Sequence, residues 1–173
     1  PETNDDVQGC TDSYAGNYDP DATQDDGSCS GYPDNGDYSL LFGANKSVDV
    51  GDVLNQTAYT KTAWIKKQTG GGYNNIFSGD NYHALGVPSE RSYKLCAGHN
   101  NLWYTVEDSE PIVSDEWVFV SVTYDPDVDS GTMKLYKNGD LVDSATGVAV
   151  QDNSTTSYIG RFAGANNFYG LID

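Results

Sequence analysis

The chain has 173 residues, and its 26 acidic and 9 basic side chains give a formal net charge of −17 at pH 7. This charge repels phosphate groups, so the composition excludes nucleic acids and anionic membranes as partners. No apolar run approaches the roughly 18 residues of a membrane-spanning helix, so no membrane insertion is expected. The chain has no initiator methionine and no signal peptide, which indicates a piece of a longer or processed protein.

The first feature along the chain is an acidic segment, Gly9–Cys29, which has a cysteine near each end, Cys10 and Cys29. It has no helix or strand period and cannot bury an apolar core, so it needs a cross-link or a cation to fold. Ca²⁺ accepts six to eight oxygen ligands in a flexible shell, which suits these side chains. The predicted pool of calcium ligands is Asp12, Asn17, Asp19, Asp21, Asp25 and Asp26. The alternative is a solvated acidic linker with incidental cysteines.

The three cysteines can form one disulfide bond and leave one cysteine free. A bond between Cys10 and Cys29 would close a loop of about twenty residues and contribute about 3 kcal/mol in the chain-entropy model. Such a bond favours an oxidising, extracellular setting. Cys96 lies in the strand-like run YKLCAG and is expected to be a small buried hydrophobe. The alternative, a reactive thiol, has no neighbouring base in the sequence to support it.

The acidic segment reads GCTDSYAGNYDPDATQDDGSC. It resembles a calcium-loop repeat of the form GCTD…NYDP…DDGSC, common in surface proteins of marine bacteria and in marine phage proteins, and is similar to thrombospondin type-3 repeats. The resemblance implies that residues 1–31 form a disulfide-closed loop with Ca²⁺ as its cofactor. Residues 32–37, rich in Gly, Pro and Asp, are predicted to be a linker.

From residue 38 onward the sequence predicts an all-β domain. Short runs rich in β-branched and aromatic residues alternate with Gly, Asn, Asp and Pro, and no convincing helix is present. Trp117–Tyr124 is apolar on both faces, as in a central strand, so Trp64 and Trp117 are expected in the core. Asn138-Gly139 predicts a type I′ hairpin turn. This pattern indicates a sandwich of two antiparallel sheets.

Residues 38–173 resemble laminin-G-like domains of the concanavalin-A-like lectin superfamily. Six sequence blocks occur here in the same order as in those domains. The blocks are Ser39–Gly43, Thr62–Lys66, Glu116–Asp125, Met133–Val142, Tyr158–Gly160 and Phe168–Asp173. The resemblance implies a jelly-roll sandwich. In the family another strand follows the last block, so the C-terminal strand is expected to be missing here. The rest of a longer chain or an adjacent subunit would then supply it.

The same resemblance implies a second structural Ca²⁺ that ties the first strand to the last. Asp173 matches the aspartate of the family motif, and Asn45 or Asp37 would lie near the first strand. Asp173 as a solvated residue at the end of the chain is the alternative.

The sequence does not favour an enzyme. It contains two histidines, His83 and His99, and none of the common catalytic motifs. The nearest acidic cluster, Glu107–Glu110, leads into Pro111 and is interpreted as a loop rather than as a pair of glycosidase carboxylates.

Sugar binding is the function that the aromatic residues favour. Six of them flank predicted loops and could stack on a pyranose ring: Tyr73, Tyr82, Trp103, Tyr104, Phe168 and Tyr169. The alternative is that these rings only pack the sandwich. We therefore expect a non-catalytic, calcium-stabilised adhesive module that is extracellular or surface-exposed and binds glycan. The second hypothesis is a structural protein of a virion or filament, whose partners would be neighbouring subunits.

Overall fold

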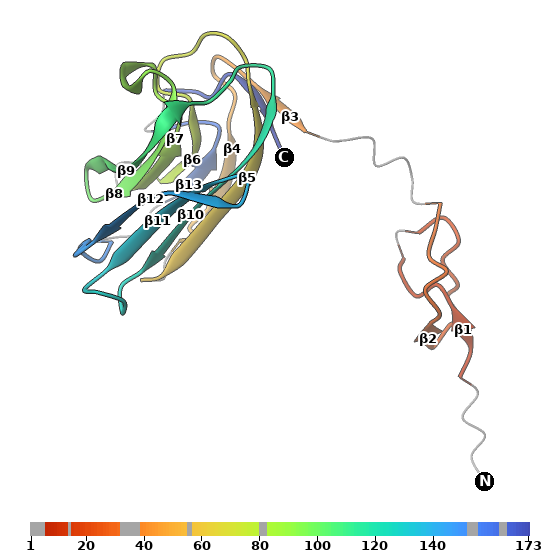
Figure 1. The fold of residues 1–173 in the computed structure, drawn as a ribbon. Coiled ribbons are helices and arrows are strands. Elements are labelled where there is room, and N and C mark those ends of the chain that lie inside the picture. Colours follow the sequence, from red (N-terminus) through yellow and green to blue (C-terminus); the bar gives the residue numbers. More distant parts are fainter. Residues whose placement is uncertain are drawn as a thin grey trace. The chain divides into compact units, whose positions relative to one another are not determined.

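The computed structural model describes residues 6–13, 15–31, 39–54, 57–79, 83–151, 156–162 and 166–173. The chain divides into two compact units, Pro1–Tyr38 and Ser39–Asp173. Apart from one short 3₁₀ helix, η1 (Ser89–Arg91), every regular element among the described residues is a β-strand (Figure 1). The all-β prediction is therefore confirmed.

The N-terminal unit is held by a cross-link and hydrogen bonds rather than by a core. Cys10 and Cys29 form a disulfide with Cα atoms 4.7 Å apart, as predicted. The Asn17 side chain accepts a hydrogen bond from the Ser30 N–H (2.7 Å) and donates one to the Ser28 carbonyl (2.8 Å). Two short strands, β1 (Gln8–Gly9) and β2 (Gln24–Asp25), pair in parallel. Among the described residues of this unit, only Cys10 and Ala15 are buried.

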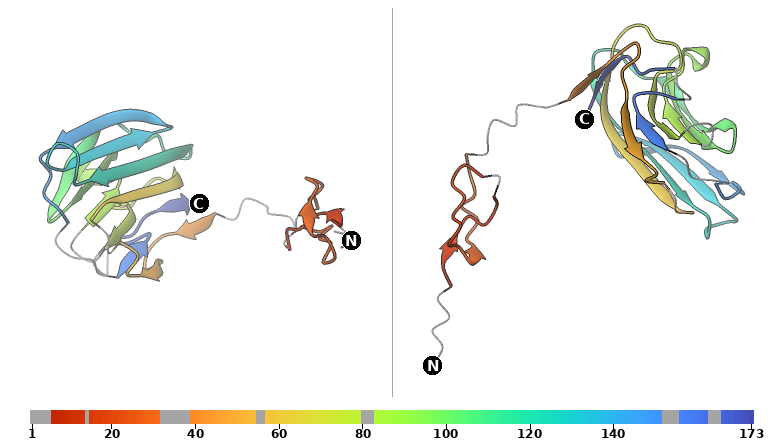
Figure 2. Two further views of the ribbon diagram at one scale, coloured as in Figure 1. Left: turned by 90° about the horizontal axis from the view of Figure 1, so that it is seen from below. Right: turned by 180° about the vertical axis from the view of Figure 1, so that it is seen from behind.

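The second unit is a sandwich of two six-stranded antiparallel sheets, stacked face to face (Figures 1 and 2). The back sheet contains, in spatial order, β12 (Asp140–Thr146), β11 (Thr132–Lys137), β10 (Trp117–Asp125), β5 (Tyr59–Lys67), β14 (Gly170–Ile172) and β3 (Leu40–Phe42). The front sheet contains β4 (Val48–Gly51), β13 (Ser157–Ile159), β6 (Asn75–Gly79), β7 (His83–Gly86), β8 (Lys94–His99) and β9 (Leu102–Pro111). The predicted two-sheet sandwich is confirmed.

Alternation along the central strands builds the core between the sheets. In β10, Val118, Val120, Val122 and Tyr124 are buried. They meet front-sheet residues such as Leu85, Leu95 and Val106 in one continuous hydrophobic cluster. Trp64 and Trp117 occupy the opposite positions of β5 and β10 and are 46% and 40% exposed. The expectation that these two tryptophans are core residues is therefore wrong, because they project from the outer face of the back sheet.

Two local predictions have clear outcomes. Asn138 (φ 53°) and Gly139 (φ 89°) form the tight turn between β11 and β12, where Lys137 pairs with Asp140, so the hairpin is confirmed. The cluster Glu107–Glu110 lies within β9 and not in a loop, which corrects the interpretation drawn from Pro111. The proline ends β9 at the edge of the front sheet, where a missing N–H donor is tolerated.

The last block of the chain pairs on both sides. β14 forms antiparallel ladders with β5 and with β3, and Asp173 extends the first of these through two main-chain hydrogen bonds with Trp64 (2.8 and 2.9 Å). β14 therefore has a paired neighbour on each side, and β3 is the first strand of this unit. That the rest of a longer chain or an adjacent subunit supplies a further strand stays a prediction.

The core also contains an unusual polar contact between the sheets. Lys61 of β5 is 4% exposed, and its Nζ lies 2.7 Å from Nδ1 of His83 in β7, which is fully buried. Nε2 of His83 has no hydrogen-bond partner among the described residues. Burial, with a further contribution from Lys61, lowers the pKa of His83 to about 2. Burial also lowers the pKa of Lys61 well below its ordinary value, so the core favours the neutral forms of both side chains.

Candidate functional site

A pocket of about 270 Å³ lies on the outer face of the front sheet. Its floor is made of small residues on two adjacent strands, Ala84 and Gly86 of β7 and Cys96 of β8. Gly86 and Cys96 are directly paired across the ladder. Small side chains at these positions let a ligand approach the sheet closely. The volume falls just below the roughly 300–1,000 Å³ typical of pockets for drug-sized ligands, so it suits a small ligand.

Four aromatic side chains line this pocket. Trp103 and Tyr104 come from β9, and Tyr73 and Phe162 come from loops. The rings of Trp103 and Phe162 meet edge to face, with centroids 4.9 Å apart, and Tyr73 is 42% exposed. Exposed ring faces around a pocket are the surfaces on which the apolar faces of sugar rings stack.

Main-chain and amide hydrogen bonds hold the two aromatic loops in place. The Ser89 N–H donates to the Gly72 carbonyl (2.7 Å), which ties the Tyr73 loop to the start of η1. The Asn75 side chain donates to the Asn166 carbonyl (3.3 Å), which ties the Phe162 loop to β6. Asn75 and Asn166 both line the pocket and add amide groups to its wall. The pocket thus combines stacking surfaces with hydrogen-bonding groups on a fixed frame.

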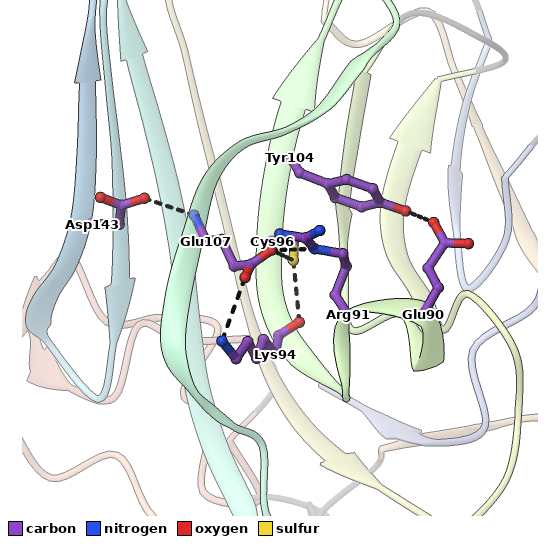
Figure 3. A network of polar contacts seen from close by, with 7 residues as sticks. All are labelled: Glu90, Arg91, Lys94, Cys96, Tyr104, Glu107 and Asp143. Atoms are coloured by element: carbon purple, nitrogen blue, oxygen red, sulfur yellow. Dashed lines mark hydrogen bonds and ion pairs between the residues drawn. The ribbon is translucent and has the colours of Figure 1, made fainter.

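A network of charged side chains lies beside the pocket (Figure 3). Arg91 and Lys94 both pair with the Glu107 carboxylate, Lys94 at 3.5 Å. On the pocket side, the Tyr104 hydroxyl donates to Glu90. The Arg91 guanidinium holds the pKa of Glu107 below its usual value. The Glu107 N–H donates to Asp143 of β12 (2.8 Å), so this network also links the edges of the two sheets.

Cys96 lies on the pocket floor as a free, buried thiol. Burial, together with the nearby Glu107 carboxylate, raises the pKa of Cys96 to about 12. The thiol therefore stays protonated at neutral pH and is a poor nucleophile. This agrees with the interpretation of Cys96 as a small buried hydrophobe.

The structure brings together three of the six aromatic residues that the sequence singled out, Tyr73, Trp103 and Tyr104. Phe168 is fully buried in the hydrophobic cluster, so its ring cannot stack on a ligand and its assignment is corrected. Tyr169 is half-buried and does not line the pocket. Tyr82 lies outside the described residues. Sequence analysis missed Glu90, Phe162 and both asparagines, because no local pattern marks loop residues that converge only in the fold.

The candidate calcium ligands do not converge in the described part of the chain. Their carboxylates close local turns instead: Asp19 accepts from the Asp21 N–H, and Asp25 accepts from the Gly27 N–H. Among the described residues, no group of three or more His, Cys, Asp or Glu side chains could hold a metal ion. Asp173 is exposed beside Trp64, Asn45 is tied to Asn167, and Asp37 lies outside the described residues.

Calcium binding by the N-terminal unit stays a prediction. Five of the six candidate ligands are carboxylates, which repel one another when no cation is bound. We therefore expect chelation by EGTA to speed proteolytic cleavage within Gly9–Cys29 several-fold while the disulfide stays intact. Unchanged cleavage, together with no calcium uptake by calorimetry, would show that the disulfide alone stabilises this unit.

Glu107 and Asp108 of β9 are engaged in ion pairs rather than arranged as a catalytic pair. Asp108 is 3% exposed and accepts a hydrogen bond from Lys137, and Glu107 is bound by Arg91 and Lys94. The two side chains also alternate along the strand, so they point to opposite faces of the sheet. They do not form the two facing carboxylates that glycoside hydrolysis requires.

Comparison with known families decides the class of the sandwich. Residues 42–173 match the concanavalin A-like lectin/glucanases superfamily. The chain belongs to this superfamily. The match covers most of the sandwich unit and leaves out the N-terminal unit, for which no family is shown. A search of curated proteins found no match.

Solved structures with a similar fold include domains of carbohydrate-active proteins. Domain 4 of an extracellular arabinanase from Geobacillus stearothermophilus, in complex with arabinotriose, is 19% identical with a TM-score of 0.54; the match covers 73% of this chain and 63% of that one. The CBM40 module of a Ruminococcus gnavus sialidase is 15% identical with a TM-score of 0.56, covering 78% and 89%. At this identity the likeness shows the fold alone.

Among the described residues, no helix is long and apolar enough to cross a membrane.

Proposed function

We propose that the sandwich is a non-catalytic carbohydrate-binding module and that its ligand occupies the front-sheet pocket. One observation carries the proposal: four aromatic side chains and three polar ones surround a floor of small residues in a pocket of about 270 Å³. Aromatic rings stack on the apolar faces of sugars, and amides and carboxylates bind their hydroxyl groups. The arabinanase domain in complex with arabinotriose and the R. gnavus module bound to α2,3-sialyllactose support the choice of ligand class.

We also propose a setting for the module. The disulfide supports an extracellular or surface location, where such bonds persist. With a net charge of −17 the protein is strongly acidic, and in a saline medium that charge is screened over about 10 Å. We propose an adhesive role in which the sandwich contacts glycan and the N-terminal unit connects it to the rest of a larger protein.

The proposal is tested by comparing Trp103→Ala with Trp64→Ala on a panel of immobilised neutral and acidic oligosaccharides, including arabino-oligosaccharides and sialyllactose. Trp103 lines the pocket, whereas Trp64 is exposed on the other sheet, so the two variants remove the same kind of side chain from different faces. Loss of a central aromatic contact typically costs about 2 kcal/mol or more, so we expect Trp103→Ala to weaken binding at least about tenfold. Trp64→Ala should bind as the wild type does.

A second candidate, a subunit of a virion or filament, has one observation in its favour. The outer face of the back sheet exposes Trp64 and Trp117 on the neighbouring strands β5 and β10, and Leu41 and Leu141 on the two edge strands β3 and β12. Exposed apolar residues of this kind can mark a protein interface. Concentration-dependent association that Trp64→Ala abolishes, in a protein that binds no glycan of the panel, would favour this candidate over the first.

A further inference from the structure

We infer that the front-sheet pocket takes a neutral sugar residue with adjacent hydroxyl groups and rejects sugars that carry a carboxylate; this inference rests on the proposed function. It concerns the charge of the pocket wall. The R. gnavus module shares the fold and has been solved with an acidic ligand, α2,3-sialyllactose, so the fold does not decide this question. The side chains of the pocket wall decide whether the pocket accepts a ligand with a carboxylate.

Glu90 is the charged group that lines the pocket among the described residues. It lies in η1, is exposed, and accepts a hydrogen bond from the Tyr104 hydroxyl at one carboxylate oxygen. Tyr104 thereby fixes the direction of the carboxylate and leaves its remaining lone pairs for a ligand. A carboxylate accepts hydrogen bonds from two neighbouring hydroxyl groups, and hydrogen bonds to charged groups are stronger than neutral ones. A neutral diol can donate two hydrogen bonds to the Glu90 carboxylate, whereas a carboxylate on the ligand is repelled by the negative charge of Glu90.

The nearby cations are engaged elsewhere. Arg91 and Lys94 share the Glu107 carboxylate, and Arg91 also lies over the Tyr104 ring, 5.1 Å from its centroid (Figure 3). Arg161 stacks on Tyr158, 3.7 Å from that ring centroid, and does not line the pocket. An acidic sugar would have to take a cation away from one of these contacts. Of the residues that the structure describes, the wall therefore presents one negative charge and no positive charge to a ligand.

The test uses pairs of oligosaccharides that differ only at C6 of the terminal residue, which is a hydroxymethyl group in galactose or glucose and a carboxylate in galacturonic or glucuronic acid. Binding is measured by calorimetry on the full chain, at low and at high salt. We expect the neutral member of the preferred pair to bind at least about tenfold more tightly, with a smaller difference at high salt because repulsion is screened.

Glu90→Gln keeps the shape of the side chain and an acceptor for Tyr104 but removes the charge. It should weaken binding of the neutral sugar about tenfold and reduce the preference over the acidic partner. Glu116→Gln is the matched control, since Glu116 is exposed, changes the net charge equally and does not line the pocket. It should leave both affinities unchanged.

Each result has a distinct meaning. Equal or tighter binding of the acidic sugars by the wild type would overturn the inference while leaving the proposed function intact. A preference for neutral sugars that persists in Glu90→Gln would overturn the role given to Glu90. Binding of no oligosaccharide at all would remove the proposed function and the inference with it.

Discussion

Acidification from pH 7 to pH 5 is expected to lower the free energy of unfolding of the sandwich by about 2 kcal/mol, because His83 must stay neutral inside the core. The folded-state pKa of His83 is lowered to about 2 by burial and by Lys61, against an ordinary value of 6.5. Between these two values the unfolded chain binds one more proton than the folded protein. The contribution of His83 to stability is therefore nearly complete above pH 6.5 and falls by about 1.4 kcal/mol per pH unit below it.

Lys61 acts in the same direction at higher pH. Its folded-state pKa lies well below the ordinary 10.5, so raising the pH from 7 to 8.5 should increase stability, because over this range the unfolded chain binds more protons than the folded protein. Above about pH 9 the opposite effect begins, because burial raises the pKa values of Cys96 and Tyr59 above their ordinary range. A maximum of stability on the alkaline side of neutrality is the expected result.

Urea unfolding across this pH range measures both effects. The double variant Lys61→Met/His83→Leu replaces the buried polar contact with apolar side chains, which is often neutral or stabilising, and should flatten the profile between pH 5 and pH 8.5. Lys134→Met is the control, because Lys134 is exposed on β11. Two results would contradict the account of the core. One is a wild-type free energy of unfolding that does not change from pH 7 to pH 5, and the other is a double variant whose free energy of unfolding changes with pH as much as that of the wild type.

Gly98→Ala is expected to destabilise the sandwich by about 3 kcal/mol or more, which is a drop of roughly 10 °C in melting temperature. A Cβ atom at Gly98 would lie 1.8 Å from the Leu102 carbonyl oxygen and 2.9 Å from the Trp103 carbonyl carbon. Both are main-chain atoms that no rotamer change can move away. β8 and β9 would have to separate at the point where their register shifts, between Ala97 and His99.

The same substitution should also weaken glycan binding, since Trp103 begins the aromatic wall at this point of β9. Gly43→Ala is the matched control, because nothing lies within 4 Å of its Cβ position and its backbone is not in the left-handed region. Thermal unfolding of both variants measures the difference. Stability of Gly98→Ala within about 0.5 kcal/mol of the wild type would contradict the close approach of the two strands.

How much of the fold the sequence predicts depends on whether the signal is local. The Asn138-Gly139 turn was predictable because its two positive φ angles need these residue types, and the strands were predictable from alternation. Alternation does not say which side faces the core when both sides are apolar. In β10 the valines face inward and Trp117 faces outward, so the two tryptophans of the back sheet were assigned to the wrong side.

The site was less predictable than the fold. Trp103 and Tyr104 carry a sequence signal because they are aromatic residues near a predicted loop. Phe162 and Glu90 acquire their roles only when separate loops meet over the front sheet. The paired strands β7 and β8 supply the pocket floor through small residues, which have no distinctive pattern. Long-range contacts of this kind are fixed by the topology and cannot be seen in any short stretch of sequence.

The central claim, that glycan binds at the front-sheet pocket, is tested most directly by following the tryptophan side chains. The chain has three tryptophans, so a ¹⁵N-labelled sample gives three indole N–H signals. One belongs to Trp103 in the pocket, and the others belong to Trp64 and Trp117 on the outer face of the back sheet. Titration with a bound oligosaccharide should shift the Trp103 indole signal and leave the other two in place. Shifts at Trp64 or Trp117, with an unchanged Trp103 signal, would contradict the account.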